Sequence, residues 1–126
     1  MNPSGNGTQI SADESFALLA RVGVGRLVFT RHALPEVLPV RFGVDPTAPV
    51  GLLPALVLPV RRDSPDAGSI DGNVIALHVD EVDPATGSGP SVVVHGRAQL
   101  SPDGSEIRLF PELVRGRLVS DRAPAK

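Results

Sequence analysis

The sequence predicts a mainly β domain, an antiparallel barrel of short strands with one short helix near the N-terminus. Residues 74–98 carry the clearest signal, because two runs of alternating apolar and polar residues flank a connection rich in glycine, proline and aspartate. In the first run Ile75, Leu77 and Val79 share one face of a strand, and the second run, 91–98, alternates in the same way. Further short apolar runs lie between turns that the 13 glycines and 13 prolines supply. This arrangement is typical of antiparallel barrels.

Composition narrows the class of protein. A chain of 126 residues predicts one domain, and the absence of cysteine excludes disulfides and thiolate metal sites. The net charge of −2, with no tryptophan or tyrosine, argues against a nucleic-acid binder. The N-terminus lacks the apolar core of a secretory signal, and the longest apolar run, 50–60, is too short to span a bilayer. We therefore expect a cytoplasmic protein with no nucleic-acid and no membrane partner.

The first regular element is expected just after residue 10. Ser11 and Glu14 have the spacing of a capping box, so a short helix should begin there and end at Gly23. Its apolar stripe would consist of Phe16, Leu19 and Ala20. The small polar residues around this domain predict a flexible tail at 1–10, a single domain at 11–119 and a second flexible tail at 120–126.

The strands follow in order and are separated by turns. The predicted strands cover 25–30, 35–43, 52–60, the two runs within 74–98, and 106–110. Pro39 cannot donate a backbone hydrogen bond, so the second strand is expected at an edge of the sheet or at a bulge. Prolines also interrupt the third strand, and the segment 61–72 after it is predicted to be a polar loop.

Sequence motifs for metal and hydrolytic chemistry are missing. His32, His78 and His95 lie on different predicted elements, without the spacing of metal ligands. The acidic cluster at 80–83 lacks the spacing of a calcium loop, and the sequence has no G-x-S-x-G elbow. We therefore predict no metal site, and the sequence identifies no catalytic side chain.

Four segments together resemble one family. They are ALLARVGVGRLVFT at 17–30, RHALPEVLPVRFGVD at 31–45, HVDEVDPATGSGPSVVVHGRA at 78–98 and IRLFPELVRGRLV at 107–119. In this order and spacing they are similar to the small split-barrel proteins that bind flavin mononucleotide (FMN) and are related to pyridoxamine 5′-phosphate oxidase. The chain resembles a small actinobacterial-type member of that family.

The resemblance implies a fold, an assembly and a cofactor. The fold is a six-stranded antiparallel split barrel, and the assembly is a homodimer that holds FMN in two equivalent clefts between the subunits. The strand residues implied to lie alongside the isoalloxazine ring are Leu38, Pro39, Val40 and Arg41. The residues implied at the phosphate are Arg61, Arg62 and Ser64, and Ser91 is implied to line the cleft. The implied function is that of a flavoprotein, an FMN-dependent oxidoreductase-like protein with a small-molecule substrate that the sequence does not identify.

The phosphate segment departs from the family pattern. The third strand and its following loop lack the family's threonine and lysine, and Asp63 and Asp66 stand close to the arginines. Two interpretations stay open for Arg61 and Arg62: they bind the phosphate, or they are solvated and pair with these aspartates. Arg41 likewise either faces the flavin or points outward from a half-exposed strand.

Two alternatives to an FMN enzyme follow from these departures. The first is a cofactor-free split-barrel module that binds or interacts with another molecule. The second is a reductase of the same fold that uses a deazaflavin. The long C-terminal section by which pyridoxamine phosphate oxidases recognise their substrate is missing from the pattern, so we do not expect that enzyme's own activity.

Overall fold

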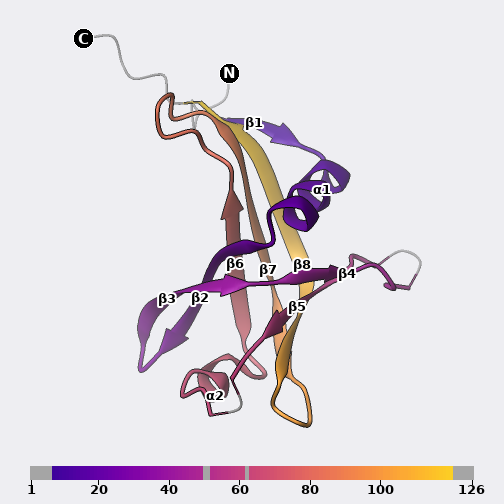
Figure 1. The fold of residues 1–126 in the computed structure, drawn as a ribbon, viewed down its shortest axis with the longest axis vertical. Coiled ribbons are helices and arrows are strands. Elements are labelled where there is room, and N and C mark those ends of the chain that lie inside the picture. Colours follow the sequence, from indigo (N-terminus) through magenta and orange to yellow (C-terminus); the bar gives the residue numbers. More distant parts are fainter. Residues whose placement is uncertain (1–6, 50–51, 62, 121–126) are drawn as a thin grey trace.

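The chain folds around one strongly curled sheet, which a computed structural model describes for residues 7–49, 52–61 and 63–120 (Figure 1). The predicted site residue Arg62 and the outer parts of both predicted tails, 1–6 and 121–126, lie outside the described residues. The elements in chain order are β1 (Gly7–Ile10), α1 (Ala12–Val22), β2 (Val24–Arg31), β3 (Leu34–Arg41), β4 (Gly43–Asp45), β5 (Ala55–Pro59), α2 (Ala67–Ile70), β6 (Val74–Asp80), β7 (Gly89–Leu100) and β8 (Glu106–Val119).

The strands form an antiparallel sheet in the order β3-β2-β6-β7-β8-β5-β4, and β1 pairs with the C-terminal part of β8. Figure 1 shows β7 and β8 running along the molecule, with the β2–β3 hairpin crossing them at a steep angle. The curl brings β3 close to β5, although the described residues form no ladder between these two strands. The barrel is therefore open between β3 and β5, and we call this opening the split.

The predicted fold class, a mainly β antiparallel split barrel, is confirmed, but the described residues form eight strands rather than the predicted six. Residues 7–10, predicted to belong to a flexible tail, form β1, because a strand added to an edge needs backbone pairing and no apolar pattern. The polar loop predicted at 61–72 contains the short helix α2, whose Ile70 is buried. A single apolar residue in a polar segment produces no periodicity that would predict a helix. The domain limits 11–119 stay a prediction.

The last strand also continues beyond its predicted end at 110. The residue after that predicted end is Pro111, which has no N–H for the ladder. In the structure the register shifts between His95 and Gly96, so that Gly96 faces Pro111 and His95 faces Leu113. The residue between them is the extra one of a β-bulge, and the bulge accommodates the proline within a continuous strand.

Helix α1 begins and ends where its sequence predicts. The Ser11 side chain accepts from the Glu14 N–H at 3.0 Å, and the Glu14 carboxylate accepts from the Ser11 N–H at 3.0 Å. Gly23 caps the helix with a left-handed φ of 72°. The predicted stripe is wrong in part, since the buried residues are Ser15, Leu18 and Leu19, Phe16 is half-buried and Ala20 is exposed. Burial of the Ser15 hydroxyl is tolerated because it donates to the Ser11 carbonyl at 2.9 Å.

The barrel interior is filled by one face of each central strand. The prediction that Ile75, Leu77 and Val79 share a buried face is confirmed, and β7 contributes Val92 and Val94 from the facing strand. Leucines from β2, β5 and β8 complete this core, and α1 covers it on one side (Figure 1). Each fully buried side chain of this size contributes about 1.5–3 kcal/mol to the free energy of unfolding.

A carboxylate on β4 ties the edge of the sheet to β8. Asp45 accepts from the Thr47 hydroxyl at 2.6 Å and from the Thr47 N–H at 2.9 Å, and Arg108 of β8 donates to it at 2.8 Å. The hydrogen bond from the Thr47 side chain, followed by that from Arg108, holds the pKa of Asp45 well below its usual range. A carboxylate with a depressed folded-state pKa stabilises the fold above its unfolded pKa of about 4, and the contribution is lost as the pH falls through the folded value.

We expect Asp45→Asn to lower the free energy of unfolding at neutral pH and to make it less sensitive to acid. The difference between wild type and variant should shrink as the pH falls below about 4, because the asparagine side chain has no charge to lose. Circular dichroism during urea unfolding at several pH values measures this difference. Asp63→Asn is the control, since the Asp63 side chain is 83% exposed, and its curve should run parallel to that of the wild type. A constant difference across the pH range for Asp45→Asn would contradict the assignment.

Candidate functional site

A cleft of about 480 Å³ lies at the split, between β3 and the end of β5 with the loop that follows it. This volume is in the range of small-molecule sites. We call it the split cleft, and its described lining consists of Leu38, Pro39, Val40, Arg41, Pro59, Val60, Arg61, Asp63, Ser64, Pro65 and Asp66. Apolar side chains therefore stand beside two arginines and two aspartates, a combination that suits a ligand with a flat apolar part and a charged group.

The sequence of β3 explains how this strand forms one wall of the cleft. Its residues alternate, so that Leu38 and Val40 pack against the core while Pro39 and Arg41 are exposed. The prediction that Pro39 lies on an edge strand is confirmed, because β3 pairs only with β2 among the described strands. Proline withholds an N–H from that edge and so disfavours closure of the ladder toward β5.

The opposite wall is a tight turn after β5. The Ser64 N–H donates to the Arg61 carbonyl at 2.9 Å, and the Ser64 hydroxyl accepts from the Asp66 N–H at 3.3 Å. Asp66 also accepts from Arg31 of β2 at 2.7 Å, which ties the turn to the β2–β3 hairpin. A contact between residues 35 apart in the chain thus fixes the turn relative to the β2–β3 hairpin.

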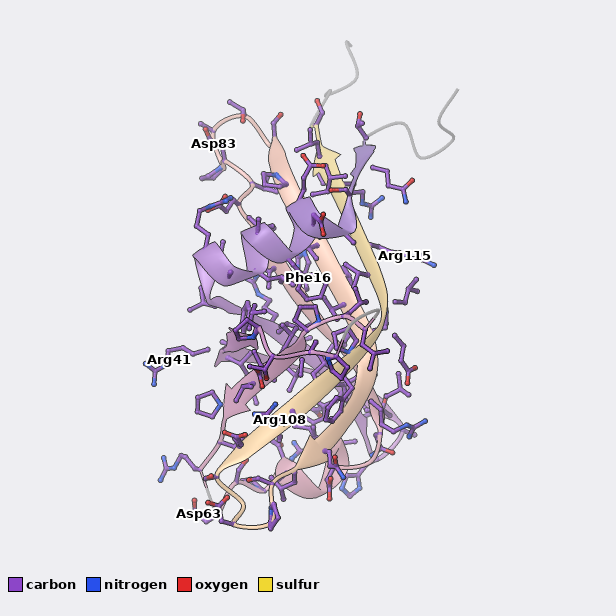
Figure 2. All side chains as sticks on the ribbon, turned by 90° about the vertical axis from the view of Figure 1, so that its right-hand side faces the viewer. Phe16, Arg41, Asp63, Asp83, Arg108 and Arg115 are labelled. Atoms are coloured by element: carbon purple, nitrogen blue, oxygen red, sulfur yellow. The ribbon has the colours of Figure 1, made fainter. Side chains whose placement is uncertain are left out.

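Of the two aspartates that could pair with the loop arginines, only Asp63 does so among the described residues. Asp66 pairs with Arg31 rather than with a loop arginine. Arg61 is 88% exposed, with its Nε 3.8 Å from Asp63, a loose contact that a stronger anion can replace. Figure 2 shows Arg41 extending away from the fold, and the described residues provide it with no ion pair. Two guanidinium groups are therefore available to a ligand.

Six of the eight predicted site residues line this one cleft: Leu38, Pro39, Val40, Arg41, Arg61 and Ser64. Arg62 lies outside the described residues. Ser91 is the exception, because it lies on β7 and its hydroxyl is 3.1 Å from the Nε2 of His78 on β6. The sequence reasoning did not include Arg31, whose partner is too distant in the chain for any local pattern to reveal.

A second cleft, of about 560 Å³, adjoins the first along β3. Its lining consists of Val22, Val24, Gly25, Arg26, Pro39, Val40, Arg41, His78 and Asp80. Pro39, Val40 and Arg41 line both clefts, so a ligand in one stands next to a ligand in the other. Arg26, His78 and Asp80 were not predicted as site residues, although Arg26 interrupts an otherwise apolar strand and so gave a signal of the kind that singled out Arg41.

An apolar row crosses the outer face of the sheet on five neighbouring strands. The ladder registers place Val37, Val28, Ala76, His95 and Leu113 side by side on β3, β2, β6, β7 and β8. Val37 is 59% exposed and Leu113 is 43% exposed. The Nδ1 atom of His95, which lies next to Leu113 in the row, is buried without a hydrogen-bond partner among the described residues.

Residues 7–49, 52–61 and 63–120 contain no group of three histidine or acidic side chains arranged to hold a metal ion. Over the same ranges, neither helix has the length and apolar character needed to cross a bilayer.

A curled antiparallel sheet with a cleft at its split defines a split-barrel protein. The chain belongs to the pyridoxamine 5′-phosphate oxidase family, because the family model with that description matches residues 11–126. The predicted family resemblance is confirmed by this match.

One relative and two solved structures are similar to this chain. The uncharacterized protein Rv0080 of Mycobacterium tuberculosis is 38% identical over 108 residues, which cover 84% of this chain and 68% of the relative. The structure of the FAD binding protein from Mycobacterium smegmatis has a TM-score of 0.73 at 24% identity and covers 89% of this chain and 97% of its own. A FAD-binding protein from Mesorhizobium loti has a TM-score of 0.72 at 21% identity, with 90% and 97% covered.

Proposed function

We propose that this chain binds FMN in the split cleft and works as an FMN-dependent oxidoreductase-like protein. The observation that carries the proposal is the convergence of six residues, chosen from the sequence alone, on one cleft of suitable size. The family supports a flavin, and two structural relatives are described as FAD-binding, so the choice of FMN belongs to this proposal.

The residues of the split cleft fit the two ends of a flavin mononucleotide. Leu38, Val40 and Val60 offer apolar contacts for the ring. Arg61 and the Ser64 hydroxyl are donors for the phosphate, and charge-assisted donors of this kind bind phosphate most strongly. Arg41, at the edge of the same strand, would stabilise negative charge on the ring. A bound flavin would supply hydride transfer, and these side chains would position it.

We also propose that two copies pair through the apolar row. Val37 and Leu113 are large apolar side chains that stand exposed at its two ends, and a matching face on a second copy would bury both. The row is self-complementary in character, since a two-fold axis through Ala76, its central residue, would place each apolar end over the other. A dimer of this kind would cover the outer side of β3 and so contribute to the clefts on either side of that strand.

The decisive experiment is a titration of the purified chain with FMN and, separately, with FAD. The chain has no tryptophan or tyrosine to quench the emission of a bound flavin, so flavin fluorescence anisotropy can be followed beside the visible flavin bands. We expect binding with a shift of the visible flavin bands, and a stabilisation of about 2.7 kcal/mol at a free flavin concentration of about 100 times Kd. If neither flavin binds to the chain or stabilises it, the result would favour the cofactor-free module. The carboxylates of Asp63 and Asp66 in the cleft support that alternative.

We expect Arg61→Ala to weaken FMN binding about tenfold, because one charge-assisted contact to the phosphate is lost. Asp63→Asn should act in the opposite direction and strengthen binding, because it removes the carboxylate that lies 3.8 Å from the Arg61 Nε. Both Kd values come from the anisotropy titration described above. Equal affinities for the wild type and Arg61→Ala would place the phosphate elsewhere.

A further inference from the structure

The second cleft holds two cationic side chains that the split-cleft proposal does not use together. Arg26 on β2 lies directly opposite His78 on β6 in the ladder, and Arg41 on β3 lies opposite Val24 of β2. All four residues line the second cleft. Within the described ranges neither arginine makes an ion pair, whereas Arg21, Arg31, Arg61 and Arg108 all do. Two arginines without an ion pair among the described residues therefore line one cleft from adjacent strands.

The only carboxylate in the described lining of this cleft already has partners. The Oδ2 atom of Asp80 lies 3.4 Å from the Nε2 of His78, and its Oδ1 atom accepts from the Val82 N–H at 3.4 Å. The same His78 nitrogen is 3.1 Å from the Ser91 hydroxyl. These contacts hold the imidazole in place at the wall and leave the arginines without an internal counter-ion.

The rest of the cleft wall is apolar and closely packed. Val22, Val24 and Val40 supply the apolar surface. Gly25 allows β2 to approach β6, because a Cβ atom at this position would lie 2.6 Å from the His78 carbonyl oxygen and 2.8 Å from a Val79 methyl group. A ligand for this cleft thus needs an apolar body and an anionic group.

We propose that the second cleft is an anion-recognising subsite that takes the phosphate or carboxylate group of a small molecule through Arg26 and Arg41. Arginine is suited to this task, because its planar guanidinium donates two parallel hydrogen bonds to such a group. His78, braced by Ser91 and Asp80, is the third polar group at the wall and positions the ligand against the valines. The subsite does not depend on flavin binding, because its residues are in place in the chain alone.

The anionic group has two sources that share this chemistry. It belongs either to the adenylate half of a dinucleotide flavin, whose ring occupies the split cleft, or to a separate substrate. The separate substrate would carry a phosphate or a carboxylate and would bind beside the ring. Both sources are compatible with the adjacency of the clefts, which share Pro39, Val40 and Arg41.

The test begins with the full chain without flavin, titrated with inorganic phosphate and with malonate and followed by two-dimensional amide NMR. We expect the largest shifts at Arg26, Gly25 and His78, and we expect Arg26→Gln to weaken probe binding there about tenfold. Arg61→Gln is the matched control, since it removes the same charge from the split cleft and should leave the shifts at Gly25 and His78 unchanged. Arg26→Lys keeps the charge and should retain part of the affinity, which separates charge from fork geometry.

A second titration distinguishes the two sources and separates this proposal from that of the flavin site. If FAD binds more tightly than FMN and Arg26→Gln removes only that advantage, the group belongs to a dinucleotide. If Arg26→Gln leaves both flavins unaffected but weakens phosphate or malonate binding to the flavin-loaded chain, it belongs to a separate substrate. The subsite is refuted if probe shifts gather only around Arg61 and Ser64, or if Arg26→Gln and wild type bind both probes equally. A chain that binds the probes but no flavin would retain the subsite and overturn the flavin proposal.

Discussion

Replacing Gly96 with alanine is expected to lower the free energy of unfolding by about 3 kcal/mol. Gly96 is buried on β7 at the bulge, opposite Pro111. A Cβ atom there would overlap the carbonyl oxygen of Phe110 and lie 2.8 Å from its carbonyl carbon and 3.0 Å from a methyl group of Leu109. The obstacle is backbone in the β7–β8 ladder, which cannot rotate away as a side chain can. The two longest strands would have to separate locally.

Circular dichroism during urea unfolding measures this loss, since the chain has no tryptophan to report by fluorescence. Gly43→Ala is the matched control, because Gly43 also lies on a strand but a Cβ atom there meets nothing within 4 Å. Its free energy of unfolding should stay within about 0.5 kcal/mol of the wild type. An equally small effect for Gly96→Ala would show that the bulge adapts, and that the approach of β7 to β8 does not require glycine.

Leu113→Asp is expected to weaken self-association by roughly two orders of magnitude, because it would bury two unpaired carboxylates at a two-fold interface. This prediction rests on the proposed dimer. Leu113 is at one end of the apolar row and is 43% exposed, so the folded protomer should tolerate the change. Light scattering at micromolar concentration should give a dimer mass for the wild type and a protomer mass for the variant.

Leu118→Asp is the control for this prediction. Leu118 lies on the same strand and is 48% exposed. Because it is five residues, an odd number, from Leu113, its side chain points to the opposite face of the sheet. The Leu118→Asp substitution should therefore leave the dimer intact. A protomer mass for the wild type, or a dimer mass for Leu113→Asp, would refute the pairing through the apolar row. Flavin affinity measured on Leu113→Asp then shows whether the split cleft needs the second copy.

Much of the fold could be predicted because it rests on local patterns. Alternation between buried and exposed residues predicted the buried faces of β6 and β7, and the capping box predicted the start of α1. The failures are elements whose residues lack such a pattern. β1 forms through backbone pairing with β8, and the end of β8 depends on a bulge opposite Pro111 that its own sequence does not specify.

The candidate site was predictable to a similar extent and for the same reason. Residues on one strand, such as Leu38 and Arg41, or in one turn, such as Arg61 and Ser64, could be grouped by position. Ser91 could not be placed, because its position relative to the clefts depends on how far β7 lies from β3 in the curled sheet. Its hydroxyl lies beside His78 of β6 instead, and β2 and β6 separate β7 from β3 in the sheet order.

The sequence by itself determined the class of fold, the family and the strand and turn that form the two walls of the split cleft. These follow from alternation, turn residues and motif order, which act over a few residues. Only the tertiary structure decided which charges are free to meet a ligand. Asp66 is neutralised by Arg31 across 35 residues, while Arg26 and Arg41 remain unpaired among the described residues, beside His78. Long-range ion pairing depends on strand register and sheet curl, and a linear pattern contains neither.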